Sequence, residues 1–181
     1  MTLDQKKYEN TVLYLCQKLN GEVRSKKKLA KLLYFADFDF YEKNQKSITG
    51  DTYRALPMGP FPVTLEEVTN EMAKKKTITI DQVTEREGYN ATEIYKSLTK
   101  PDMSVFDADE IKMLDRVVNK YGHLSGKQTM SAFKSIFPKK HAFLAVVHVE
   151  GGVQALRNAK IAEQEGADGI FLINHSISYP V

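Results

Sequence analysis

The chain has 181 residues, of which 42% are hydrophobic and 27% are charged, and its formal net charge is +3. This length suits one domain of ordinary size with a small addition, and the balance excludes a globally disordered chain. The charge is too small to predict nucleic-acid binding from composition, and a single cysteine, Cys16, excludes an internal disulfide and indicates a reducing compartment.

The N-terminal segment MTLDQKKYEN has no apolar core of the kind a secretory signal needs. No stretch of the sequence approaches the roughly 20 apolar residues of a membrane-spanning helix. We therefore expect a cytoplasmic protein without membrane contact.

Two amphipathic helices are predicted first along the chain. Thr2 and Gln5 have the spacing of a capping box, and Gly21 stands where a helix C-terminus favours glycine. Ser25 caps a second helix that runs to about Asn44. This second helix should be the most buried of the chain, because most of its circumference is apolar. Its core positions are Leu29, Leu32, Leu33, Ala36 and Phe40.

Breakers dominate the next stretch, SITGDTYRALPMGPFP (residues 47–62), which therefore reads as a stiff loop with a short extended piece at 51–56. Thr64 and Glu67 predict another capping box and helix. Residues 77–85 alternate and are rich in β-branched side chains, so they predict a hairpin or edge ribbon with a turn at Gly88.

Two further helices are expected at 107–121, opened by Asp107 and Glu110, and at 126–137, opened by Ser125 and Gln128. After Pro138 the pattern changes to an apolar run, a helical segment and a second apolar run, which predicts a βαβ unit. The predicted fold is α+β: a mostly helical domain with a small β ribbon over residues 1–137, and a short βαβ extension over 138–181.

Several separated blocks give a family resemblance that covers residues 5 to about 135. They are KLLYFAD (31–37), TGD (49–51), YRA (53–55), MGP (58–60) with Pro62, and YGHLSGKQ (121–128). With these blocks the chain resembles the Panacea-domain family of SocA-like antitoxins and phage-associated proteins. The resemblance implies an antitoxin that binds and neutralises a co-encoded protein toxin. In one type of member it implies an adaptor that delivers the toxin to a protease.

The last 43 or so residues resemble one βαβ unit of a (β/α)8 barrel. In a full barrel His148, Glu150, Asn174 and His175 would lie at strand ends, where such enzymes place catalytic groups. A barrel needs roughly 200 residues or more, so this chain alone forms no barrel active site. The extension therefore packs on the helical domain, joins a partner or is the remnant of a gene fusion, and we favour the remnant.

Tyr34, Asp37 and Tyr41 fall at i, i+3 and i+7, which places two phenols around one carboxylate. In the structural interpretation Asp37 accepts hydrogen bonds from the loop at 49–51 or pairs with Arg54, because a buried carboxylate needs donors. In the functional interpretation this face binds a partner. The LPMGPFP segment likewise reads either as a connector that buries Phe61 or as a preordered set of interface anchors.

The predicted partner-binding surface combines this helix face with the loop after it. In this prediction Asp37, Asp51 and Arg54 hold the loop, while the aromatic side chains and Met58 supply contact area. The predicted residues are Tyr34, Asp37, Tyr41, Asp51, Tyr53, Arg54, Met58, Gly59 and Pro60.

Other classes of function have weaker support. The four histidines have no metal-ligand spacing and no phosphate-binding or nucleophile motif occurs, so we expect no metal, no cofactor and no enzyme. Helices 107–121 and 126–137 have the proportions of a helix-turn-helix, with Lys127 and Lys134 as candidate DNA contacts. This keeps a DNA-binding autoregulator as an alternative. Lys26 to Lys28 oppose the dipole of their helix, which favours either an acidic partner or a solvated face.

Overall fold

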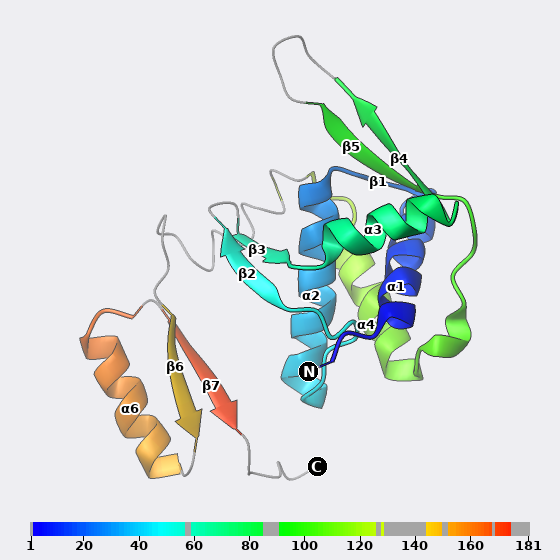
Figure 1. Cartoon of the computed structure of the whole chain (residues 1–181). Coiled ribbons are helices and arrows are strands. Elements are labelled where there is room, and N and C mark those ends of the chain that lie inside the picture. The colour runs from blue at the N-terminus through cyan, green and yellow to red at the C-terminus, as the bar shows by residue number, and fades with distance from the viewer. Residues whose placement is uncertain are drawn as a thin grey trace. The chain divides into compact units, whose positions relative to one another are not determined.

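The chain divides into two compact units, residues 1–131 and 132–181. The structure, a computed structural model, describes residues 2–56, 59–84, 91–125, 128, 144–149, 152–167 and 169–174. The first unit is mainly helical with two small antiparallel sheets, and the second has a parallel strand pair, so the predicted α+β class is confirmed (Figure 1). Among the described helices, none is long and apolar enough to span a membrane.

The described ranges of the first unit contain the helices α1 (Gln5–Lys18), α2 (Lys26–Asn44), α3 (Leu65–Lys74) and α4 (Ala108–Tyr121), with a 3-10 turn at Met103–Val105. Helix α2 packs against α1 and α4 (Figure 1). It also packs against the strands β1 (Glu22–Arg24), β3 (Gly59–Pro62) and β5 (Thr92–Ser97). All five predicted core positions of this helix, Leu29, Leu32, Leu33, Ala36 and Phe40, are at most 1% exposed. The prediction of a central buried helix is therefore confirmed.

The helix starts match the sequence only in part. Helix α1 is capped by Asp4, whose carboxylate accepts from the Lys7 amide at 3.0 Å, so the capping box predicted at Thr2 is wrong. Ser25 and Thr64 occupy N-cap positions, but neither side chain caps its helix. The capping box at Asp107 and Glu110 is confirmed in both directions.

The larger sheet has the strand order β1-β5-β4, with all pairs antiparallel. Strands β4 (Ile78–Val83) and β5 (Thr92–Ser97) form the predicted ribbon, whose predicted turn at Gly88 lies outside the described residues. Strand β1 (Glu22–Arg24) was not predicted, because three residues give too short a pattern to detect.

The second sheet is a hairpin of β2 (Tyr53–Leu56) and β3 (Gly59–Pro62), paired from Tyr53 opposite Pro62 to Leu56 opposite Gly59. The sequence predicted only the extended piece that contains β2. The prediction of a loop at 59–62 was wrong. Proline has no backbone N–H, and a strand tolerates it at positions where that N–H would point away from the partner strand.

In the second unit, β6 (Leu144–Val149) and β7 (Gly169–Asn174) pair in parallel around α6 (Gly152–Gln164). This is the predicted strand, helix and strand. The capping box predicted at Ser125 and Gln128 is confirmed in both directions. The rest of the helix predicted at 126–137 and the two barrel-type residues Glu150 and His175 lie outside the described residues.

Candidate functional site

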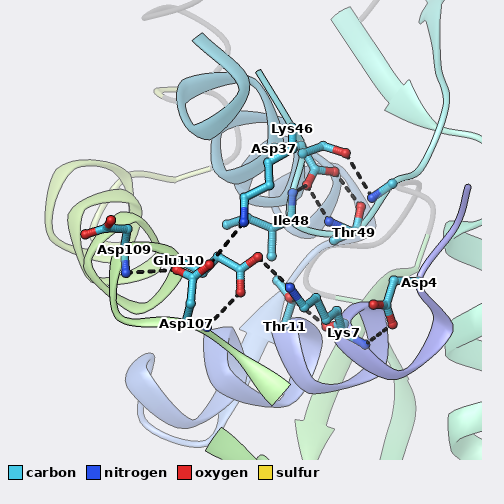
Figure 2. Close-up of polar contacts among 12 residues, drawn as sticks. Asp4, Lys7, Thr11, Asp37, Lys46, Ile48, Thr49, Asp107, Asp109 and Glu110 are labelled. Atoms are coloured by element: carbon cyan, nitrogen blue, oxygen red, sulfur yellow. Dashed lines mark hydrogen bonds and ion pairs between the residues drawn. The ribbon is translucent and has the colours of Figure 1, made fainter. Parts of the chain in front are cut away.

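The buried carboxylate of Asp37 ties the end of α2 to the loop that follows it. The side chain is 1% exposed, and its Oδ1 accepts from the backbone amides of Ile48 at 2.9 Å and Thr49 at 2.8 Å. Its Oδ2 accepts from the Thr49 hydroxyl (Figure 2). The same oxygen accepts from the Tyr53 phenol at 2.7 Å. The structure thus shows the first of the two predicted arrangements, a carboxylate that binds the loop rather than Arg54.

Burial raises the pKa of the Asp37 carboxyl, and the hydrogen bonds from Thr49, Tyr53 and Ile48 act in the opposite direction. Burial and the charge of Asp37 together raise the pKa of Tyr53 well above its ordinary value. The phenol therefore stays protonated and remains a donor to the carboxylate. This group of atoms is a structural clamp around an interior carboxylate, since Asp37 is 1% exposed.

Asp51 forms a second clamp at the other end of the same loop. Its Oδ1 accepts from the Thr52 amide at 2.7 Å, and its Oδ2 accepts from the Thr64 amide at 3.3 Å and the Thr64 hydroxyl at 2.9 Å. The hydroxyl expected to cap α3 is therefore used to hold Asp51. The fully buried phenol of Tyr8 lies beside this carboxylate, and burial and the Asp51 charge raise its pKa.

The N-terminal segment lies over this loop. The amide of Asp4 donates to the Thr49 carbonyl at 2.9 Å. Gly50 has φ +73°, and a Cβ at this position would lie 2.3 Å from the carbonyl oxygen of Thr2. Glycine is thus required at residue 50 both for its backbone conformation and for the close approach of the segment above it.

Three rings join the hairpin to α2. The Tyr34 and Phe38 centroids are 4.2 Å apart, and the Tyr53 ring meets them edge-on at 5.5 and 5.4 Å. Burial raises the pKa of Tyr34 to about 12. Tyr41, in contrast, is 36% exposed. The predicted face is therefore split: Tyr34 and Tyr53 are half-buried, Asp37 is interior, and Tyr41 is accessible.

The hairpin supplies the exposed part of the site. Arg54 lies exposed on β2, and no carboxylate lies within ion-pair distance of it in the part of the chain that the structure describes. Leu56 is 40% exposed and Val63, just after β3, is 47% exposed. Gly59 and Pro60 are half-buried, and Met58 lies outside the described residues.

Phe61 pairs with Arg54 across the hairpin and is partly buried against the core. Its burial is therefore intermediate between the two predictions, a connector that buries Phe61 and an exposed interface anchor. Leu56 and Val63 were missing from the predicted surface. Strand alternation would have found them, because Thr52, Arg54 and Leu56 share one face of an extended segment.

Lys31 is a further residue that the prediction left without a role. It stands in the apolar stripe of α2, is 4% exposed, and donates from Nζ to the Pro60 carbonyl at 2.9 Å. Burial lowers its pKa to about 8, so the ammonium stays mostly charged at neutral pH. The signal in the sequence was a lysine between the predicted core positions Leu29 and Leu32.

Two of the three lysines at the start of α2, Lys26 and Lys28, have partners within the chain. Lys26 pairs with Glu66 and Glu93, both at 3.0 Å, and Lys28 donates to the Gly122 carbonyl. Their position against the helix dipole therefore has a structural reason and no longer favours an acidic partner. Within the described ranges there is no group of three or more His, Cys, Asp or Glu side chains that could hold a metal ion.

A family model described as "Antitoxin SocA-like, Panacea domain" matches residues 29–133. No curated protein and no solved structure matches the chain. The matched region contains most of α2, both clamps, the hairpin and α4, and it covers more than half of the sequence.

Proposed function

The chain belongs to the SocA-like, Panacea-domain antitoxin family, and from this premise we propose that it neutralises a co-encoded protein toxin by binding it directly. The observation that supports this proposal is the hairpin β2–β3. It displays an arginine and apolar side chains to solvent. Two buried carboxylates, Asp37 and Asp51, accept hydrogen bonds from Tyr53 in β2 and from Thr64 after β3.

The exposed residues have the composition of a protein-binding surface. We define the hairpin face as Arg54, Leu56 and Val63, with Tyr41 of α2 as a further accessible ring. Arginine and tyrosine are enriched among the residues that dominate binding energy at interfaces. An arginine with no carboxylate of its own has donors free to bind a partner's acid.

The clamps contribute by preorganisation. Asp37 and Asp51 accept seven hydrogen bonds between them from the loop, the hairpin and the start of α3. A surface that is already ordered loses little entropy on binding, so more of the contact energy appears as affinity. Asp37, Asp51 and Tyr53 thus act from the interior in this proposal, and Arg54 supplies a contact rather than holding the loop.

Growth rescue tests the proposal. The neighbouring open reading frame is expressed in a bacterial host with and without this chain, and then with Arg54→Ala and Leu56→Ser. We expect the unchanged chain to restore growth and both variants to rescue it less well, because truncating a central interface arginine commonly costs about 2 kcal/mol or more.

Arg116→Ala is the matched control, since Arg116 is an exposed arginine on α4 away from the hairpin. Its rescue should equal that of the unchanged chain. Binding of the two purified proteins should show the same ranking. A harmless neighbour, or rescue that persists in both hairpin variants, would contradict the proposal. Loss of the toxin only in hosts that contain a given protease would instead favour the adaptor mechanism.

A further inference from the structure

The hairpin has one closed edge and one open edge, as its pairing pattern shows. In an antiparallel pair, residues alternate between pairs that exchange backbone hydrogen bonds and pairs whose N–H and C=O groups point away from the partner strand. The Val63 amide donates to the Thr52 carbonyl at 2.8 Å, which makes that pair a hydrogen-bonded one. By alternation, Tyr53 opposite Pro62 and Ala55 opposite Pro60 are the pairs whose backbone groups point outward.

The outer edge of β3 is closed. The two positions whose backbone nitrogen would face this edge are 60 and 62, and both are proline, which has no N–H. The carbonyl of Pro60 at the same edge already accepts from the buried ammonium of Lys31 at 2.9 Å. A further strand therefore finds no donors on β3.

The outer edge of β2 has no hydrogen-bonded strand beside it among the described residues. The same alternation leaves the N–H and C=O groups of Tyr53 and Ala55 directed away from β3. No described residue makes a hydrogen bond to these four groups. Unpaired groups of this kind are a template for an added strand, and proteins commonly cover or block such an edge. In this hairpin the edge of β3 is blocked by its two prolines and by the Lys31 ammonium, while the N–H and C=O groups at the edge of β2 can pair with an added strand.

We propose that an extended segment of the toxin adds to the edge of β2 as a third strand. This inference rests on the proposed antitoxin function and names the chemistry of its partner. The backbone of the segment pairs with Tyr53 and Ala55, which supplies affinity that depends little on sequence. Neighbouring strands place side chains on shared faces, so an acidic side chain of the segment lies beside Arg54 and an apolar one beside Leu56.

Main-chain pairing of this kind accepts many sequences, and only two side-chain positions of the segment are read. The arrangement also assigns a purpose to the clamps. Tyr53 carries one of the two pairing amides, and its phenol is fixed to Asp37 at 2.7 Å, so the edge keeps its position before the partner arrives.

Amide hydrogen exchange by NMR on the full chain tests the inference without any mutation. In the free protein we expect the amides of Arg54 and Leu56 to be protected and those of Tyr53 and Ala55 to exchange quickly. With the toxin from the neighbouring open reading frame bound, Tyr53 and Ala55 should become protected by at least about tenfold, which corresponds to about 1.4 kcal/mol.

Ala55→Pro is the matching variant, because it removes one outward N–H and leaves the hydrogen-bonded pairs of the hairpin intact. We expect toxin affinity to fall by about tenfold or more, while Ala55→Ser, which keeps the N–H, binds within about threefold of the unchanged chain. Arg54→Glu should weaken binding by a similar factor through like-charge repulsion.

The outcomes separate the two proposals. Toxin binding without protection at Tyr53 and Ala55 overturns the strand addition and leaves the antitoxin function standing. Absence of toxin binding overturns both. Protection of these two amides in the free chain, rising with protein concentration, assigns the edge to a second copy of the chain and also overturns the proposal.

Discussion

At the scale of single residues, Asp37 should matter most for stability. Its carboxylate satisfies two buried backbone amides as well as two hydroxyls, and replacing it by alanine leaves those amides without an acceptor. We expect Asp37→Ala to lower the free energy of unfolding by about 3–5 kcal/mol, since each unsatisfied buried group costs about 1–3 kcal/mol.

Asp37→Asn is the matched variant, because its side-chain oxygen still accepts from Ile48 and Thr49 while the hydroxyls of Thr49 and Tyr53 turn to accept. Its cost should be about 1 kcal/mol, the size of an ordinary hydrogen-bond rearrangement. Urea denaturation of both variants measures the difference. Equal effects of the two changes would show that the backbone amides do not depend on this carboxylate.

At the scale of elements, the N-terminal segment and the loop beneath it should form one unit. Gly50→Ala places a methyl group 2.3 Å from the Thr2 carbonyl oxygen on a backbone with φ +73°. Gly21→Ala is the control, since Gly21 has φ +90° but nothing within 4 Å of its added Cβ. We expect about 1–2 kcal/mol of destabilisation at Gly21, from backbone strain alone, and a clearly larger loss at Gly50.

Thermal unfolding with amide exchange at Asp4 measures this difference. Because Asp4 donates to Thr49, its amide should lose protection in Gly50→Ala and keep it in Gly21→Ala. Removal of the residues before Leu3 should relieve the additional cost at Gly50. Equal costs in the two variants would contradict the close approach.

The elements also show what the sequence can predict. The stripe of α2, the capping box at Asp107 and the strand–helix–strand pattern after residue 143 are local periodicities, and all three were predicted. Asp51 was correctly predicted to hold the loop. Its partner Thr64, however, was predicted to cap the next helix. Both roles use the same hydroxyl, and only the folded position of Asp51 decides between them.

Strand β3 and Lys31 could not be predicted for a related reason. Proline argues against a strand in sequence, yet Pro60 and Pro62 alternate with the pairing positions and are compatible with one edge. A lysine among apolar helix positions is unfavourable unless its buried ammonium finds an acceptor. That acceptor is the carbonyl of Pro60, which is 29 residues away in the sequence. Long-range pairings of this kind carry no local pattern.

At the scale of the whole molecule, the described part of the second unit is one helix and a pair of strands. Helix α6 has no buried residue among those described, and Val153, Leu156 and Ile161 are 87%, 59% and 49% exposed. A pair of strands with one helix is marginal as an independent fold. The family match ends at residue 133, before this unit begins its first strand.

We propose that residues 1–137 carry the antitoxin function and that the extension at 138–181 is a remnant without a part in it. A chain ending at Lys139 should therefore neutralise the same toxin as the full chain and unfold within a few degrees of the same temperature, because the clamps and the hairpin all lie before residue 65. Growth rescue and thermal unfolding of both lengths measure this. Loss of rescue with unchanged unfolding would show instead that the extension helps to choose the toxin, while a lower unfolding temperature would show that it stabilises the first unit.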